Sequence, residues 1–339
     1  MSDSNERSTL GRLLQKTLGL DPSFRLSLVH HCVEILRELT HDLALDPPVN
    51  APDERSEDSG PSIPVPEAVP LPAGSPSVLP EYGDEASLDR ARTEALDVFA
   101  SRPVDQHSYV VLWMDQVHVW GHPLLLCLGA TSEGYRHFLG FAEAPPRDMV
   151  PIHRLFQDLI HRGIGTEPGP FCITSGDAQL SRLVAESLHP NGLQYCQVRK
   201  RERVVSYLKD SDRDRIKGAL MRAYAFPGYE EAHAALMEIH ADLLRCNRSV
   251  AHVLKQDLEQ TLTVHRTGRL DQLSRSFRSP RCLTRAAQKL NQRVKGLPPT
   301  ARRAQIAFVL LEMELRMRRL DHASELSTLP TLLSAQASV

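Results

Sequence analysis

The sequence predicts an α/β protein built around a mixed β-sheet, and three observations lead to this class. Residues 108–144 contain three β-rich runs, SYVVLWMDQVHVW, PLLLCLGAT and YRHFLGFAEA, separated by the turn signals WGHP and SEGY. Helical and strand-like patterns then alternate to residue 198, and nearly every later segment has helical periodicity. Three antiparallel strands followed by alternating helices and strands are typical of a ribonuclease-H-like layer.

The elements after the three-stranded meander follow from local patterns. The amphipathic stretch 148–164 predicts a helix, which Gly163 and Gly165 would end. GPFCIT at 169–174 and LQYCQV at 193–198 predict the fourth and fifth strands, with a helix at 178–188 between them. Further helices are expected at 201–208, 211–224, 228–246, 248–265, 280–295 and 300–320.

The N-terminal part differs from the rest of the chain in its apolar pattern and its proline content. Apolar residues at helical spacing predict a short helical segment, whereas the tract that follows holds ten of the 24 prolines and should be a disordered linker. We expect this order: helical N-terminal segment 1–45, Pro-rich acidic disordered linker 46–83, connecting helix 84–107, ribonuclease-H-like core 108–210, helical insertion 211–270, C-terminal helices completing the core 271–325, and tail 326–339.

Charge is distributed unevenly along the 339 residues, although the formal net charge is only −2. Residues 1–100 carry 8 basic and 18 acidic side chains, and 266–303 holds 11 basic residues and one acid, Asp271. An acidic arm beside a basic surface suggests a polyanionic partner, most often nucleic acid. A solvated face, or docking of the acidic half on the basic half, would give the same asymmetry.

Targeting and redox signals are absent from the sequence. The terminus MSDSNERSTL has no apolar stretch of the signal-peptide kind, and no apolar run approaches the roughly 18–20 residues of a membrane span. The six cysteines include no CxxC pair, so neither a zinc knuckle nor a disulfide framework is indicated. We expect a cytoplasmic protein with no membrane partner and no small-molecule substrate.

Asp115 is an acid inside an otherwise apolar strand, VVLWMDQVHV. Burial of a lone carboxylate is costly, so such a residue usually holds a metal, a base or an arginine. ITSGDAQL places Ser175, Gly176 and Asp177 just beyond the fourth strand, where they could face Asp115. The same S-G-D is ordinary turn chemistry, with Asp177 as the N-cap of the next helix.

Two basic stretches are candidates for contact with a polyanion. YCQVRKRERVV carries Arg199, Lys200, Arg201 and Arg203, whose side chains suit phosphate oxygens or, alternatively, a solvated and salt-bridged helix. RSFRSPRCLTRAAQKLNQR has no acid in 19 residues. Its basic side chains are spaced so that several share one helical face. The basic residues of this stretch are Arg275, Arg278, Arg281, Arg285, Lys289 and Arg293.

Several stretches together resemble the mutator-type transposases of bacterial insertion sequences. They are LWMDQ, CLGATSEGYRHFLGF, QYCQVRKRERVVSYL, LKQDLEQTLTVHRTGRL, RSFRSPRCLTRAAQ and FVLLEMELRMRRL, and they occur in the family's order over about residues 99–330. The family patterns are LWLDG, ALGxxxEGRKxxLGF, QRCQVHKxRNV, LxEGLEETLTxxRLG, RSFxTTNxIESxN and ALLExExRxRRV. The resemblance implies a ribonuclease-H-like fold, DNA as the partner and assembly into a homo-oligomer.

The resemblance also implies an Asp–Asp–Glu triad that holds two divalent metals, and here the match fails in part. Asp115 corresponds to the first aspartate, which makes it the metal ligand that is retained. Ser175 falls on the second aspartate, with Asp177 two residues later, and Thr284 falls on the glutamate. Arg199 stands where the family's Cys-x-x-His run has histidine, and Arg203 where it has asparagine.

A hydroxyl brings no charge to Mg²⁺, which relies on carboxylates and substrate phosphates. We therefore expect a transposase-like DNA-binding protein impaired in cleavage and strand transfer. The alternative is an active transposase that uses Mg²⁺ with Asp115, Asp177 and an unplaced acid. A third interpretation is an interaction protein whose acidic, Pro-rich arm covers the basic face.

Overall fold

The computed structural model describes residues 85–145, 148–167, 169–268, 277, 281–320 and 323–337. The chain divides into two compact units, Met1–Ala91 and Arg92–Val339, and the elements below belong to the second unit, apart from the first turns of α3 (Glu85–Ser101). The N-terminal segment 1–45 and the linker 46–83 predicted from the sequence lie outside the described residues.

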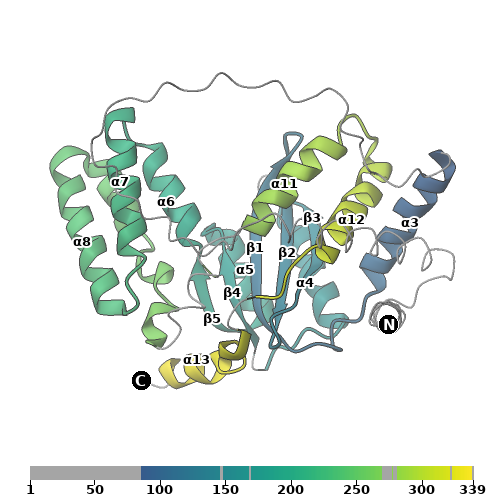
Figure 1. Cartoon of the computed structure of the whole chain (residues 1–339), viewed down its shortest axis with the longest axis horizontal. Helices are drawn as coiled ribbons and strands as arrows, with labels where there is room; N and C mark the ends of the chain where they lie inside the picture. The colour runs from purple at the N-terminus through teal and green to yellow at the C-terminus, as the bar shows by residue number, and fades with distance from the viewer. Residues whose placement is uncertain are drawn as a thin grey trace, which may run out of the picture. The chain divides into compact units, whose positions relative to one another are not determined.

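One five-stranded mixed sheet forms the centre of the second unit, in the order β3-β2-β1-β4-β5 (Figure 1). β1, β2 and β3 are antiparallel, and β4 and β5 run parallel to β1. The strands are β1 (Tyr109–Val119), β2 (His122–Thr131), β3 (Arg136–Glu143), β4 (Gly169–Thr174) and β5 (Pro190–Tyr195). The predicted mixed α/β class and the three-stranded meander are confirmed.

The β1–β2 hairpin turns on Trp120 and Gly121, whose φ angles are 52° and 74°. Two consecutive positive φ angles make a turn whose twist matches the flanking strands. Glycine adopts this conformation at little cost, whereas Trp120 is held there by hydrogen bonds to Asn291. The turn fixes the register, so Val119 pairs with His122 and Asp115 with Leu126.

Alternate residues of β1 point to opposite faces of the sheet. Leu112 and Met114 pack with α4 (Val150–His161) and α5 (Ala178–Leu188) in one buried cluster. Trp113 and Val117 belong to the cluster on the other face. That face is covered by Phe277, α11 (Arg281–Arg293) and α12 (Pro299–Leu315). Asp115 therefore lies on the α11 face, by the two-residue period of a strand.

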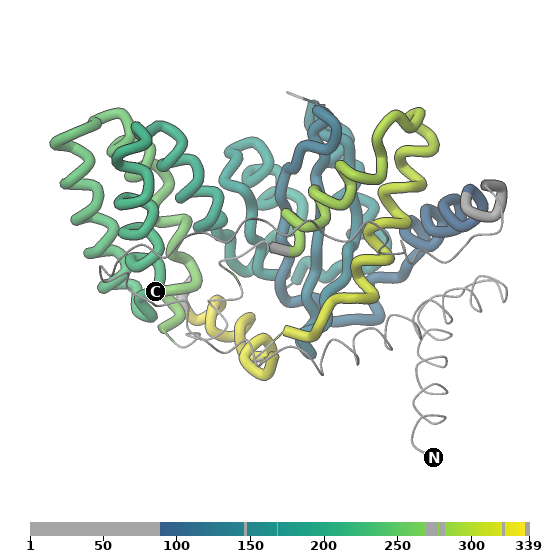
Figure 2. The backbone as a smooth tube through the Cα atoms, turned by 45° about the horizontal axis from the view of Figure 1, so that its top comes forward, coloured from purple at the N-terminus to yellow at the C-terminus, as the bar shows by residue number. Residues whose placement is uncertain are grey.

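A group of four helices has a buried cluster of its own. They are α6 (Gln197–Ser206), α7 (Asp210–Ala223), α8 (Tyr229–Cys246) and α9 (Arg248–Lys255). In Figure 2 they form one set of neighbouring tubes in the teal-green to green part of the colour scale. Since α6 follows β5 directly, this group attaches to the sheet at the carboxyl end of β5.

The single helix predicted at 248–265 was wrong, because α9 ends at Lys255. Asp257 has a φ of 55°, a left-handed conformation that an α-helix cannot continue through. Two short 3₁₀ turns follow, Glu259–Thr261 and His265–Thr267. Thr261 stabilises the first turn, since its hydroxyl donates to the Leu258 carbonyl (2.6 Å) and accepts from the Tyr224 hydroxyl (3.1 Å).

Two further differences concern the ends of elements. The fifth strand was predicted at 193–198 but spans Pro190–Tyr195, because Gly169 of β4 pairs with Pro190 and α6 already begins at Gln197. A helix, α13 (Leu329–Ala337), lies in the segment expected to be a tail. Its Leu329 and Leu333 are buried in the α11-side core, and the Asn191 amide donates to the Pro330 carbonyl (2.7 Å). None of the described helices is long and apolar enough to cross a membrane.

Candidate active site

The candidate site lies where β1, β4 and α6 meet. Met114 of β1 pairs in parallel with Thr174, the last residue of β4, so Asp115 and Ser175 are the next residues in line on neighbouring strands. Thr174 in turn pairs with Tyr195 of β5, after which α6 begins. The register thus brings Asp115, Ser175 and the first turn of α6 to one region of the sheet.

Asp115 forms a buried ion pair with Arg199 of α6. The Arg199 Nε and Nη2 atoms donate to Asp115 Oδ2 at 2.9 and 2.5 Å. The aspartate side chain is only 5% exposed, and Arg199 is 30% exposed. Asp115 Oδ1 is also buried and has no hydrogen-bond partner among the described residues. The alternative in which a strand acid is paired with an arginine is therefore confirmed.

Burial and the ion pair act on Asp115 in opposite directions. Burial raises the pKa of the Asp115 carboxyl above its usual range, although the hydrogen bonds and charge of Arg199 lower it. Burial lowers the pKa of Arg199, but the hydrogen bonds and charges of Asp115 and Glu202 outweigh burial and raise it overall. The pair therefore secures the guanidinium charge but only partly offsets the desolvation of the carboxylate, one oxygen of which is unpartnered.

Glu202 is the second acid on the same guanidinium, with Arg199 Nη1 donating to Glu202 Oε2 at 3.0 Å. Glu202 is exposed, at three residues along α6 from Arg199. Glu202 was not among the residues predicted from the sequence, although a salt-bridged helix was one of the two interpretations of this stretch. The i, i+3 spacing of Arg199 and Glu202 was the available signal.

Ser175 and Asp177 occupy the turn between β4 and α5. Ser175 is half-buried, and Gly176 has a φ of 85°, which glycine adopts readily. Asp177 is exposed, and its Oδ1 accepts a hydrogen bond from the Leu180 backbone N–H at 2.8 Å. The interpretation of Asp177 as the N-cap of α5 is confirmed.

Replacing Asp177 with alanine should lower the free energy of unfolding by about 1 kcal/mol, because one backbone N–H of α5 loses its acceptor. Asp177→Ser retains an acceptor at the cap and should stay within a few tenths of a kcal/mol of the wild type. Urea denaturation of the full chain measures both values. Equal losses in the two variants would show that Asp177 stabilises the chain by something other than the cap.

Thr284 lies on the exposed side of α11. Leu283, Ala286 and Leu290 form the buried side of this helix, and Gln288 is exposed one turn after Thr284. The far end of α11 is fixed to the hairpin, because the Trp120 backbone N–H donates to Asn291 Oδ1 at 2.7 Å. The Trp120 indole N–H also donates to the Asn291 carbonyl, at 2.5 Å.

These side chains do not fit a pair of divalent metals. The retained carboxylate, Asp115, is held by a guanidinium, while Ser175 and Thr284 offer neutral oxygens. Among the described residues, no group of three or more His, Cys, Asp or Glu side chains could hold a metal ion. A two-metal site needs several carboxylates to balance its charge.

The basic residues of α6 differ in exposure. Lys200 is buried, and its ammonium donates to the Val253 carbonyl at 2.7 Å and to the Gln256 carbonyl. Burial lowers the pKa of Lys200 to about 8. Arg201 is half-buried, and Arg203 is exposed and donates to Gln256 Oε1 at 3.2 Å. Lys200 therefore joins α6 to the end of α9, and its role in DNA binding stays a prediction.

One buried acid, Glu312, offsets part of the positive charge around α11. Glu312 of α12 pairs with Arg293 and lies 3.5 Å from the Lys289 ammonium. Arg285 is exposed on the same helix. Arg275 and Arg278 lie outside the described residues, as does the side chain of Arg281.

Comparison with known proteins identifies one matching family. The family model described as "Transposase, Mutator family" matches residues 86–304, which include β1 to β5, α6 to α9 and α11. A search of curated proteins returned no match. The family match covers well over half of the chain and includes Asp115, Ser175 and Thr284. The chain therefore belongs to the Mutator family of transposases.

Proposed function

We propose that this protein is a transposase-like DNA-binding protein in which metal-dependent cleavage and strand transfer are impaired. Family membership supports a transposase-like function, with DNA as the implied partner and divalent metal as the general requirement. In this proposal residues 108–210 form a ribonuclease-H-like core, 211–270 a helical insertion, and 271–325 the helices that complete the core. The strand order β3-β2-β1-β4-β5 supports such a core.

The Asp115–Arg199 ion pair is the observation that carries the proposal of impaired catalysis. The guanidinium takes the place that a cation would need beside Asp115, at 2.5 Å from Oδ2. A divalent ion would have to displace Arg199 and leave that side chain to Glu202 alone. With neutral Ser175 and Thr284 at the other two positions, little charge is available to hold the ion after that displacement.

Several basic side chains support DNA binding. Their positive charge is present although two acids of the family triad are replaced by Ser175 and Thr284. Arg203 and Arg285 are exposed, and Arg201, Lys289 and Arg293 are half-buried, so their guanidinium or ammonium groups could reach phosphate oxygens. Contacts of this kind are largely independent of DNA sequence and weaken steeply as salt is added. Lys200 is left out of this proposed surface because its ammonium is buried against Val253 and Gln256.

An active transposase remains the alternative, and one observation favours it. Asp115 and Glu202 share a single guanidinium, so the release of Arg199 would leave two carboxylates facing the same space. Glu202 is then a candidate for the acid that the sequence could not place. The predicted Asp177 is less suited, because its carboxylate is engaged as a helix cap.

DNA binding and cleavage by the full-length chain test the proposal directly. We expect labelled duplex DNA to be bound with an affinity that falls by about a hundredfold or more between ~50 and ~200 mM salt. We expect no Mg²⁺- or Mn²⁺-dependent cleavage of the same DNA. Asp115→Asn, prepared identically, controls for contaminating nuclease. Cleavage by the wild type that this variant lacks would overturn the proposed impairment, and salt-insensitive or absent binding would overturn the DNA-binding function.

A further inference from the structure

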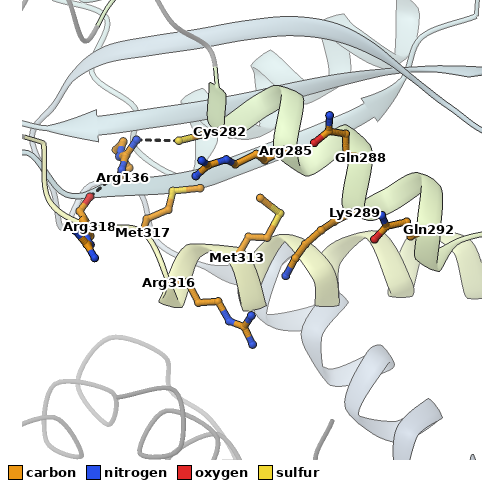
Figure 3. Close-up of a pocket in the computed structure, with 10 residues that line it drawn as sticks. All are labelled: Arg136, Cys282, Arg285, Gln288, Lys289, Gln292, Met313, Arg316, Met317 and Arg318. Atoms are coloured by element: carbon orange, nitrogen blue, oxygen red, sulfur yellow. Dashed lines mark hydrogen bonds between the residues drawn. The ribbon is translucent and has the colours of Figure 1, made fainter. Parts of the chain in front are cut away.

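A cavity of about 620 Å³ lies between α11 and the end of α12, with β3 at one side. Five of its lining side chains are cationic and none is acidic. These are Arg136, Arg285, Lys289, Arg316 and Arg318. In Figure 3 Arg285 and Lys289 of α11 lie on the side of Met313 of α12, and Arg136 lies at the end near Cys282. We call this cavity the arginine pocket. The stripe read from the sequence contained only Arg285 and Lys289 of this set.

Arg136 is held in place by neutral acceptors. Its Nη1 atom donates to Cys282 Sγ and its Nη2 atom to the Arg318 carbonyl, both at 2.8 Å. The Nε atom is buried and has no hydrogen-bond partner among the described residues. The guanidinium is therefore fixed without a carboxylate to balance its charge, an arrangement that an incoming anion would complete.

Glu312 is the acid that balances part of the remaining charge. It lies 3.5 Å from Lys289 and 3.3 Å from Arg316, and it also pairs with Arg293. Within the described part of the chain, no carboxylate lies in ion-pair distance of Arg285 or Arg318, which are both exposed. One buried acid therefore serves several cations, and the pocket keeps a positive excess.

The pocket also has an apolar wall. Met313 of α12 and Met317, two residues past the end of that helix, line it opposite Arg285 and Lys289, which lie one turn apart on α11 (Figure 3). Guanidinium forks match phosphate oxygens, and thioether side chains adapt to uneven apolar surfaces. A ligand with a phosphate next to a less polar ring would contact both sides, and a nucleotide unit has this composition.

We propose that the arginine pocket binds a phosphate group of the bound DNA strand, with the adjoining deoxyribose against Met313 and Met317. This inference rests on the proposed DNA-binding function and names the site within it. It adds Arg136 of β3, together with Arg316 and Arg318 from the segment just after α12, to the residues that contact the strand.

A double variant, Arg285→Gln with Arg318→Gln, tests the assignment in the full chain. Both side chains are exposed, so we expect thermal melting to be unchanged. Binding of a labelled duplex and of a single strand of equal length is measured by fluorescence anisotropy over a salt series. Losing two phosphate contacts should reduce the slope of log K against log salt by about 2 and weaken binding at least about tenfold at low salt.

The matched control is Arg215→Gln with Arg245→Gln, which removes the same charge from exposed arginines of α7 and α8. Those helices do not line the pocket. If the pocket variant binds as the control does, the inference fails while DNA binding by the wild type still stands. Absent binding by the wild type overturns the proposed function as well. If inorganic phosphate raises the melting temperature of the wild type but not of the pocket variant, while DNA binding is equal in both, the pocket belongs to a free phosphate group and the inference is overturned.

Discussion

Replacing Arg199 with methionine is expected to lower the free energy of unfolding by about 3 kcal/mol at neutral pH, because Asp115 then remains buried without its counter-ion. The expected value lies at the lower end for broken buried pairs, since Arg199 is 30% exposed. Adding Asp115→Asn to the same chain should restore most of the loss, because no buried charge remains. Urea denaturation of the two single variants and the double variant gives the coupling energy.

The loss of unfolding free energy caused by Arg199→Met should also depend on pH, and its direction follows from the pKa of Asp115. The folded-state pKa of Asp115 is already raised by burial, and removing Arg199 takes away the main influence that lowers it. A carboxyl with a raised folded pKa binds its proton more tightly in the native chain, so stability falls as pH rises from the unfolded pKa through the folded pKa. The deficit of Arg199→Met relative to the wild type should therefore shrink as the pH is lowered into that window.

Arg182→Met is the control for this experiment. Arg182 forms an ion pair of the same kind with Glu186, but the two side chains are 81% and 57% exposed. Loss of such a surface pair should lower the free energy of unfolding far less than loss of the buried pair. If Arg199→Met were as mild as this control, or if Asp115→Asn failed to rescue it, the buried ion pair would not be the stabilising feature that the proposal requires.

Phe277→Ala is expected to lower the free energy of unfolding by about 4 kcal/mol, the range for a fully buried phenylalanine. Phe277 is 1% exposed and lies on the α11 face of the sheet. Its ring packs against Trp113 of β1 and Phe171 of β4, with both centroids at 5.8 Å. Removing the ring leaves a cavity over the two strands that flank the candidate site. Chemical denaturation, with circular dichroism to verify the fold, measures the loss.

Phe226→Ala provides the comparison, because Phe226 is 43% exposed and should contribute far less. Phe277→Leu keeps much of the buried volume and should recover more than half of the loss. A small effect of Phe277→Ala would mean that the segment before α11 does not hold this side chain against the sheet.

The strands of the meander could be predicted because their signals are local. Apolar runs broken by Trp120–Gly121 and by the SEGY turn specify three strands without reference to the rest of the chain. β5 was misplaced because Pro190, Asn191 and Gly192 are poor strand formers. They become a strand through parallel pairing with β4, a contact that no local pattern contains. The end of α9 likewise depends on tertiary contacts made by Thr261 and Lys200.

The sequence predicted which residue of the site needs a partner, but it could not predict which residue that partner is. An acid in an apolar strand needs a partner, so Asp115 could be identified from the sequence, with a metal, a base or an arginine as its possible partners. The partner itself could not be chosen, because Arg199 is 84 residues away and reaches Asp115 only through the order of β1, β4 and β5. The arginine pocket was missed for the same reason, since Arg136 and Arg318 come from elements far apart in the sequence.

The hydrogen bonds between Trp120 and Asn291 make the fluorescence of Trp120 a probe of whether α11 stays attached to the hairpin. The chain has two tryptophans, of which Trp113 is buried in the core and Trp120 is 44% exposed at the hairpin tip. The Trp120 indole donates to the backbone of α11, and the Lys295 ammonium lies 5.2 Å from its ring centre. Detachment of α11 would free the Trp120 indole to water and shift its emission, and it would also uncover the face of the sheet on which Trp113 lies.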